Sequence, residues 1–314
     1  MGFDLDTLRD AVTAHGPVAR VVIAKTEGSS PREVGAAMLV WKDGQSGTIG
    51  GGTLEFQATS EARTALPGAP DRLSAHALGP DLGQCCGGRV HLLREVYDAA
   101  RLTTLTGEVI ARSPAGGPQP LAVTRLLAQA RNQGTLPMPH LLHGWMIEPL
   151  HRPAHPLWIW GAGHVGRALA QTLAPLPQFD ITWIDTAPDR FPPNIPVGVT
   201  SLPAAHPERL VPHAPQDAHH LILTYSHTLD LALCHALLGH GFASAGLIGS
   251  ATKWARFRSR LAALGHAPGA ITQITCPIGA PELGKHPQAI ALGVATGLLR
   301  DMAANPAQRK EKSA

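Results

Sequence analysis

The chain has 314 residues, a length that suits two domains, and 44% of them are hydrophobic, as in an ordinary soluble globular protein. The formal net charge is only +3, and no basic stripe with interleaved aromatic residues favours nucleic-acid binding. No run approaches the roughly 18 apolar residues of a membrane span, and no signal-peptide pattern is present. Four cysteines are too few for a disulfide framework, so we expect a reduced, cytoplasmic protein without a membrane or nucleic-acid partner.

The first half of the chain predicts a mixed α/β domain over residues 1–150. The spacing of apolar residues predicts helices, and β-branched composition predicts strands. The predicted elements are a helix over 3–12, strands over 20–26 and 38–41, a helix over 54–65, and strands over 73–78 and 89–96. Residues 98–150 are harder to interpret, although 102–110 has helical spacing and 121–127 has the composition of a strand.

Two glycine-rich loops of this domain are candidates for ligand contact. Gly28-Ser29-Ser30-Pro31-Arg32 is a run of turn formers that ends in a cation, Arg32. Gly50-Gly51-Gly52 loses much backbone entropy on folding, so it is either a flexible turn or a loop whose backbone lies against a ligand or another chain. A helix follows, and Glu55 in its first turn either complements the helix dipole or belongs to a site.

Two adjacent cysteines, Cys85 and Cys86, lie on a glycine-flanked turn between two predicted strands. Turn N–H groups, or the cations Arg32 and Arg89, could lower the thiol pKa and raise the thiolate fraction. A soft thiolate suits sulfur transfer or a soft metal. Zinc is disfavoured, since no second Cys-x-x-Cys or histidine pair has the required spacing. A pair of small apolar residues remains the alternative.

Alternating strands and helices predict a Rossmann-like domain with a parallel sheet over residues 151–314. The predicted strands cover 157–160, 180–184, 197–202, 219–225, 243–248 and the short segment 271–276, and the helices follow 164 and cover 228–239, 254–264 and 290–302. Several prolines follow the second strand, and each costs a helix about 3 kcal/mol, so we expect the usual second helix to be missing or displaced. Cys234 lies on an apolar helical face and is predicted to be a core residue. For Cys276 both a structural and a functional role stay open.

The first of these strands runs straight into the Gly-x-Gly-x-x-Gly turn Gly161-Ala162-Gly163-His164-Val165-Gly166, and a helix follows at once. Gly161 allows the tight turn, Gly163 lets the backbone approach a phosphate, and Gly166 lets helix and strand pack closely. The helix N-terminus attracts an anion. His164 either contacts that anion or lies on the surface.

Polar residues also follow the other predicted parallel strands, at the edge where ligands bind in open α/β sheets. Asp185 ends the second strand about 20 residues past the glycine turn, where such folds place a ribose-binding carboxylate. His227 and Asp230 follow the fourth strand, unless they only cap a helix. Ser250 and Lys253 follow the fifth, and a solvated lysine is the alternative there. We expect these residues to converge on one crevice.

In this order, the motifs resemble those of the XdhC/CoxI family over nearly the whole chain. They are Gly28-Ser29-Ser30-Pro31-Arg32, Gly35-Ala36-Ala37-Met38, Ile49-Gly50-Gly51-Gly52-Thr53-Leu54-Glu55, Gln84-Cys85-Cys86-Gly87-Gly88, Gly161-Ala162-Gly163-His164-Val165-Gly166, Asp185-x-x-x-Asp189-Arg190-Phe191-Pro192, Ser226-His227-x-x-Asp230, Ile248-Gly249-Ser250-x-x-Lys253 and Cys276-Pro277-Ile278-Gly279. The resemblance implies an XdhC/CoxI-type N-terminal domain followed by a Rossmann-like domain. It further implies an accessory protein of purine catabolism, not an enzyme, which binds molybdenum cofactor, protects it during sulfuration and inserts it into apo-xanthine dehydrogenase.

The resemblance also implies a cofactor site and partners. The implied cofactor-binding residues are Arg32, Gly51, Glu55, Cys85, Cys86, Gly161, Gly163, His164, Gly166, Asp185, His227, Asp230, Ser250 and Lys253. Either cysteine could contact molybdenum, but Cys86 carries over more safely than Cys85, because the family more commonly has cysteine directly before Gly-Gly. The implied partners are the molybdenum subunit of apo-xanthine dehydrogenase and a cysteine desulfurase that supplies sulfur. The oligomeric state stays open, a homodimer included.

Two other functions are compatible with a Rossmann-like domain. One is an NAD(P)-dependent oxidoreductase, and the other is a scaffold that helps to assemble a partner enzyme. The proline-rich segment after Asp185 and the lack of an evident acid–base pair argue against the oxidoreductase. The convergent polar residues argue against a pure scaffold. The sequence leaves open whether the Rossmann-like domain holds the cofactor, a nucleotide or nothing.

Overall fold

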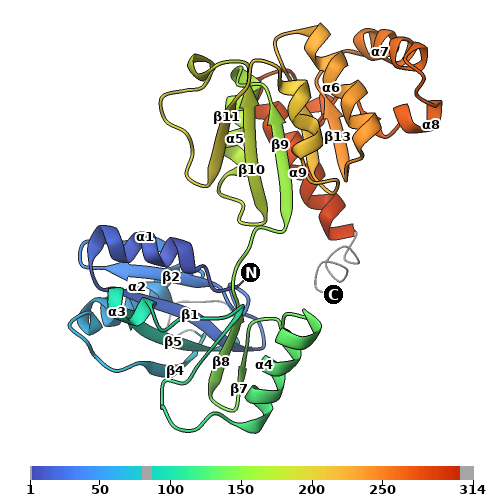
Figure 1. The fold of residues 1–314 in the computed structure, drawn as a ribbon. Coiled ribbons are helices and arrows are strands. Elements are labelled where there is room, and N and C mark those ends of the chain that lie inside the picture. The colour runs from blue at the N-terminus through green and yellow to red at the C-terminus, as the bar shows by residue number, and fades with distance from the viewer. Residues whose placement is uncertain (1, 80–86, 305–314) are drawn as a thin grey trace. The chain divides into compact units, whose positions relative to one another are not determined.

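The computed structural model describes residues 2–79 and 87–304 of the chain. Within this part the chain forms two compact units, of which the first ends at Arg152 and the second begins at Pro153. Figure 1 colours the first unit blue to green and the second yellow-green to red. Among the described residues, no helix has both the length and the apolar character needed to cross a bilayer.

Among its described residues, the first unit contains two antiparallel sheets and four α-helices. Its strands are β1 (Val18–Glu27), β2 (Ala37–Trp41), β3 (Gly44–Gly47), β4 (Arg72–Ala77), β5 (Arg89–Tyr97), β6 (Val109–Arg112), β7 (His140–Leu142) and β8 (Trp145–Pro149). Its helices are α1 (Leu5–His15), α2 (Gly52–Ala65), α3 (Ala99–Leu102) and α4 (Leu121–Gln133). The larger sheet has the order β3-β2-β1-β5-β4, and the smaller one has the order β6-β8-β7.

Side chains alternate along a strand, so the central strand β1 contributes residues to both faces of its sheet. Its first seven residues are all buried, which shows that both faces are covered there. Ala19, Val21 and Ile23 pack in one cluster with residues of α2, and Val18 packs in another with residues of α1. Arg20 belongs to the second of these faces, although it carries a charge. The smaller sheet lies beside this part of the unit, with β8 near β1 and β5 (Figure 1).

Two predictions for the first unit are wrong. The predicted helix over 102–110 is interrupted, since Gly107 takes a positive φ of 87° and residues 109–112 form β6, which pairs with β8. The predicted strand over 121–127 is the start of α4, which follows Pro120 and ends at Gly134 in the left-handed conformation. Leucine and valine suggested a strand there, but the buried residues of α4, Val123 and Ala130, are two helical turns apart.

The second unit is a doubly wound α/β fold, which confirms the predicted Rossmann-like class. Its strands are β9 (His155–Trp160), β10 (Phe179–Asp185), β11 (Val199–Pro203), β12 (His219–Ile222), β13 (Ser244–Leu247) and β14 (Ile274–Thr275). Its α-helices are α5 (His164–Leu173), α6 (His227–His240), α7 (Ala251–Ala263), α8 (Pro268–Ile271) and α9 (Pro287–Ala304). The sheet has the order β11-β10-β9-β12-β13-β14, and every pairing that joins these strands is parallel.

Helices cover both faces of this parallel sheet. Leu157 and Ile159 of β9 share a core cluster with apolar residues of α5 and α9, whereas Trp158 and Trp160 share the opposite cluster with residues of α6 and α7. As expected from the prolines, no α-helix lies between β10 and β11, where the short 3₁₀ helix η2 (Pro188–Arg190) replaces it. The strand order reverses between β9 and β12, so the loops after these two strands flank the switch point.

Candidate functional site

Two glycines of the turn after β9 are required by the packing of the turn itself. Gly161 has φ of +120°, and a Cβ atom there would collide with the carbonyl oxygen of Leu223. A Cβ on Gly166 would collide with the carbonyl oxygen of Gly161. The turn is also tied to β10, because the Gly161 N–H donates to the Ile184 carbonyl at 2.7 Å. Neither glycine needs a ligand to explain it.

Gly163 is different, because nothing in the fold requires a glycine there. Its φ of −71° is open to any residue, and a Cβ would meet no atom within 4 Å. Gly163 is the N-cap of α5, and no described side chain caps that helix. By contrast, the serines Ser226 and Ser250 cap α6 and α7. The first N–H groups of α5 therefore have no side-chain cap, and such uncapped groups at a helix N-terminus can receive a phosphate.

Asp185, at the end of β10, is buried against the glycine turn. One oxygen, Oδ2, accepts from the Ala162 N–H at 2.6 Å, and the other accepts from the Thr186 N–H at 2.6 Å. The Nε atom of Arg190 lies 3.4 Å from Oδ1. With only 2% of its side chain exposed, the carboxylate holds the turn in place, and it is not turned outward as a ribose-binding acid would be.

Asp230 and Lys253 form a second buried pair at the same edge of the sheet. Lys253 Nζ lies 2.6 Å from Asp230 Oδ2 and donates to the Ile248 carbonyl at 2.8 Å. Asp230 Oδ1 accepts from the N–H and hydroxyl of Thr224, at 3.1 and 2.8 Å. The alternatives of a helix-capping Asp230 and a solvated Lys253 are therefore both wrong, since Ser226 caps α6 and the lysine side chain is only 11% exposed.

The thiol of Cys276 lies next to this pair. A Cβ placed on Gly249 would contact both Lys253 Cδ and Cys276 Sγ, so the two side chains flank the same glycine. Burial raises the pKa of the Cys276 thiol, while the Lys253 ammonium opposes that shift. Cys234 is fully buried, as predicted, and burial together with the Asp230 carboxylate raises its pKa to about 12. Cys276 is thus the more accessible of these two thiols.

The two histidines expected at the site lie on the surface. His164 is the first residue of α5 and His227 the first residue of α6, and both are exposed. Neither imidazole ring has a hydrogen bond or ion pair with the residues that the structure describes. Either ring is free to turn toward a ligand, but the fold does not fix its orientation.

In the first unit, the glycine-rich loops come together. A Cβ on Gly88 would collide with the carbonyl oxygen of Ser29, and a Cβ on Gly50 would lie 2.6 Å from Pro31. The loop 28–32 therefore packs against the other two loops. Cys85 and Cys86 lie outside the described residues, but Gly88, close behind them in the chain, is fixed against residues 27–29.

Glu55 holds the triple-glycine turn together. Its Oε2 accepts from the Thr48 hydroxyl at 2.5 Å and from the N–H groups of Ile49 and Gly51, both at 3.0 Å. Although burial opposes its charge, these hydrogen bonds hold the pKa of Glu55 below its usual value. Its role is thus more specific than a general complement to the helix dipole. Arg32 instead pairs with the neighbouring Glu33, at 3.3 Å.

Comparison with known proteins assigns both halves of the chain to one family. The XdhC Rossmann domain matches residues 157–298, and the XdhC and CoxI family matches residues 11–75. The chain belongs to the XdhC and CoxI family. YqeB of Escherichia coli, an uncharacterized protein, is 26% identical to this XdhC-family chain over 294 residues. That alignment covers 90% of the chain but only 43% of YqeB, so the chain spans less than half of this relative.

A solved structure has a similar fold. The crystal structure of a xanthine dehydrogenase from Bacillus halodurans superposes with a TM-score of 0.70 at 20% sequence identity, and the match covers 96% of each chain. At that identity the match shows the fold alone. Within the described part of this XdhC-family chain, no three His, Cys, Asp or Glu side chains group as a metal site.

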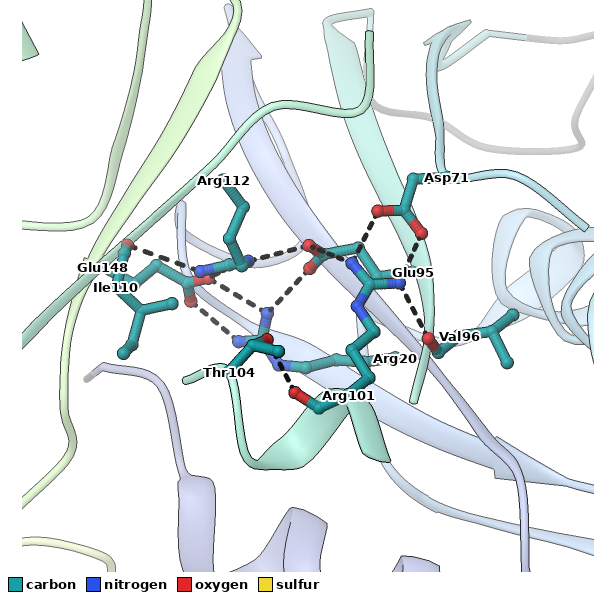
Figure 2. A network of polar contacts seen from close by, with 9 residues as sticks. All are labelled: Arg20, Asp71, Glu95, Val96, Arg101, Thr104, Ile110, Arg112 and Glu148. Carbon is teal, nitrogen blue, oxygen red and sulfur yellow. Dashed lines mark hydrogen bonds and ion pairs between the residues drawn. The ribbon is translucent and has the colours of Figure 1, made fainter. Parts of the chain in front are cut away.

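A buried network of charges in the first unit was not foreseen from the sequence. Arg20 of β1 lies 2.7 Å from Glu148 of β8, and Arg112 of β6 bonds both Glu148 and, at 2.7 Å, Glu95 of β5 (Figure 2). All four side chains are at most 8% exposed. Two cations balance two anions, and the network links the larger sheet to the smaller one.

The outer part of the network reaches the surface through Arg101. Its guanidinium pairs with Asp71 at 2.6 Å and lies 3.6 Å from Glu95 (Figure 2). Although burial opposes the charge of Glu148, the guanidinium groups of Arg20 and Arg112 hold its pKa below the usual value. The sequence contained one signal that could have revealed the network. Arg20 in β1 and Glu148 in β8 are charged residues at positions whose neighbours on the same face of the strand are apolar.

Proposed function

We propose that this protein is an accessory protein of xanthine dehydrogenase, as its family suggests, and that its cargo is molybdenum cofactor. In this proposal it binds the cofactor, protects it while a cysteine desulfurase supplies the terminal sulfur, and delivers it to the molybdenum subunit of the apo-enzyme in the cytoplasm. It acts as a chaperone and has no turnover of its own. The observation that carries the proposal is the N-terminus of α5. Its N-cap residue is Gly163, no described side chain caps the helix, and the packing of the fold does not require a glycine at this position.

The residues present suit the two chemically different ends of such a cargo. Molybdenum cofactor is an anionic pterin with a phosphate and a soft metal held by a dithiolene. The N–H groups at the start of α5 would hold the phosphate, and Arg190 and Lys253 add positive charge at the same edge of the sheet. Cys276 supplies a soft sulfur beside Lys253. Cys86 and Cys85 remain the thiols that the family resemblance implies as molybdenum contacts.

The main competing function is an NAD(P)-dependent oxidoreductase. The ribose of NAD would need an acceptor at the end of β10, but both oxygens of Asp185 already accept hydrogen bonds from backbone N–H groups. This weakens the oxidoreductase in favour of a carrier. Cofactor content and NAD(P) binding of the same preparation separate the two functions directly.

Gly163→Val is the sharpest test of the proposed site. Valine fits the backbone conformation and its Cβ atom meets no other atom within 4 Å, so the fold should be retained while the side chain blocks a phosphate. We expect pterin and molybdenum content to fall at least about tenfold, equivalent to about 1.4 kcal/mol of binding free energy. Gly239→Val is the matched control, since Gly239 is an exposed glycine of α6 with equally open space. If a folded Gly163→Val variant loads cofactor and activates apo-xanthine dehydrogenase like the parent, the turn is only structural.

The cysteine turn is tested by Cys86→Ser, Cys85→Ser and the double variant. Oxygen is a harder ligand than sulfur and of similar size, so Cys86→Ser should sharply reduce cofactor retention or transfer. Cys85→Ser should have a smaller or equal effect, and Cys234→Ala, a buried position, serves as the control. If all three serine variants load and deliver cofactor normally, the cargo has no ligand in this turn.

A further inference from the structure

Two loops meet across the glycine turn of the second unit. Arg190 follows β10 and Tyr225 follows β12, and the guanidinium carbon of Arg190 lies 4.6 Å from the centre of the Tyr225 ring. In the sheet, β9 lies between β10 and β12, and the three strands are parallel. The contact between Arg190 and Tyr225 therefore crosses the carboxyl end of β9, where residues 161–163 begin the phosphate turn.

Arg190 is fastened to that turn at two points. Its Nε atom lies 3.4 Å from Asp185, whose other oxygen accepts from the Ala162 N–H. Its carbonyl accepts from Arg167 Nη2 at 3.0 Å, while Arg167 Nε donates to the Ala162 carbonyl, also at 3.0 Å. The Arg190 side chain is still 38% exposed. A planar cation is thus held at a fixed place beside the turn, with part of its surface available.

Tyr225 offers a flat apolar surface at the same place. The residue is 66% exposed even though Arg190 lies over the ring. The loop that carries it is ordered by its neighbours, since the Thr224 hydroxyl donates to Asp230 at 2.8 Å and the Ser226 N–H donates to the Thr224 hydroxyl at 3.2 Å. An exposed aromatic ring on a fixed loop is a ready stacking partner for another ring.

We propose that Arg190 and Tyr225 form a clamp for the flat nitrogen heterocycle of a phosphorylated ligand whose phosphate lies on the start of α5. The ring of the ligand stacks on Tyr225. Arg190 contacts the Tyr225 ring as well, and its positive charge attracts the phosphate. A pterin phosphate and a purine nucleotide share this chemistry. The choice of a pterin rests on the proposed function, whereas the clamp itself does not.

The test compares Tyr225→Ala and Arg190→Ala with the parent protein. The probes are molybdenum cofactor released from a purified molybdoenzyme, AMP and NADP+, each measured by equilibrium binding. Loss of one stacked ring should weaken binding about 5- to 150-fold. Tyr225→Phe keeps the ring and should bind like the parent, and Arg190→Lys keeps the charge but not the plane and should lie between. Arg258→Ala, at an exposed arginine of α7, is the matched control.

The possible outcomes separate the clamp from the proposed function. If the parent binds the pterin and the alanine variants bind it much more weakly, both stand. If the parent binds AMP or NADP+ but not the pterin, and the alanine variants bind these nucleotides much more weakly, the clamp stands and the proposed function fails. The clamp is overturned if the folded alanine variants bind every probe like the parent, or if the parent binds none of them. Since Arg190→Ala also removes a partner of Asp185, Tyr225→Ala with unchanged thermal unfolding is the deciding variant.

Discussion

The two units both bury carboxylates beside cations, but they place them differently. In the first unit, Arg20, Glu95, Arg112 and Glu148 are sealed between two sheets, which we call the inter-sheet network. In the second, Asp185 and Asp230 are buried, while their partners, Arg190 and Lys253, are 38% and 11% exposed at the ends of strands. The same ion-pair chemistry cross-links layers when both charges are enclosed, and it leaves a cation partly exposed when one charge reaches the edge of a sheet.

The largest effect should come from opening the inter-sheet network. Glu148→Ala leaves the guanidinium groups of Arg20 and Arg112 buried without their shared partner, which typically costs about 3–5 kcal/mol. Hydrogen exchange followed by mass spectrometry should locate the lost protection in the first unit and leave the second unit unchanged. Glu108→Ala removes an exposed carboxylate of the same unit and should change stability by less than about 1 kcal/mol. Equal effects of the two substitutions would contradict an enclosed network.

The second effect is a loss of stability at acidic pH, and it should be confined to the second unit. His220 is buried on β12, and its Nδ1 accepts from the Trp160 indole at 3.1 Å, which requires a neutral ring. Burial, with a smaller contribution from His219 and His240, lowers the pKa of His220 to about 3. The unfolded chain binds a proton near the ordinary pKa of about 6.5, so it gains protons that the folded unit cannot accept.

It follows that stability should not depend on this group above pH about 6.5, and should fall as the pH drops from about 6.5 toward 3. The slope approaches about 1.4 kcal/mol per pH unit. Urea unfolding at a series of pH values measures it, and His220→Gln, which can still accept from Trp160, should flatten the curve. His164→Gln, at an exposed histidine, should keep the parent slope. A His220→Gln curve as steep as the parent curve would assign the acid sensitivity to other groups.

A smaller loss of stability is expected at the edge of the parallel sheet. Lys253→Met removes the cation from Asp230, but the N–H and hydroxyl of Thr224 still donate to that carboxylate, and the Lys253 side chain itself is 11% exposed. The cost should be about 1–3 kcal/mol, below that of Glu148→Ala. Lys253→Arg should restore part of it. If Lys253→Met costs as much as Glu148→Ala, the edge pair is as enclosed as the inter-sheet network.

The smallest effect distinguishes two thiols of one unit. Native protein treated with iodoacetamide should be labelled at Cys276, which is half-buried, and not at Cys234 until it is unfolded. Because burial raises the pKa of the Cys276 thiol, labelling should be slow at neutral pH and should accelerate as the pH rises. Peptide mapping reads the two sites separately. Labelling of native Cys234 at a comparable rate would mean that α6 opens readily.

The strong patterns of the sequence predicted most elements correctly, while weak patterns failed for physical reasons. The turn 161–166 was predictable because glycine spacing after an apolar strand has few other uses, and the missing helix after β10 followed from the prolines. The predictions for segments 102–110 and 121–127 were wrong because short apolar runs fit both the helical and the strand periodicity. Tertiary contacts decide between the two.

The residue types at the candidate site were predictable, but their partners were not. Sequence reasoning placed Asp185 and Asp230 at strand ends, yet it could not show that both carboxylates turn inward. It missed Tyr225, because an exposed aromatic residue in a loop looks unremarkable until its neighbour across β9 is known. Pairings between distant residues, such as Arg20 with Glu148, depend on the fold as a whole.

The packing of α9 has a consequence for how the protein is made. Val294 and Leu298 of this helix share a core cluster with Ile159 of β9 and with Leu169 and Leu173 of α5, more than a hundred residues earlier in the chain. While a ribosome is still synthesising the intervening segments, the apolar side chains of β9 and α5 that α9 will bury have no partner from that helix. The nascent second unit therefore exposes an apolar surface until residue 298 has left the exit tunnel, whereas the first unit can close its own cores much earlier.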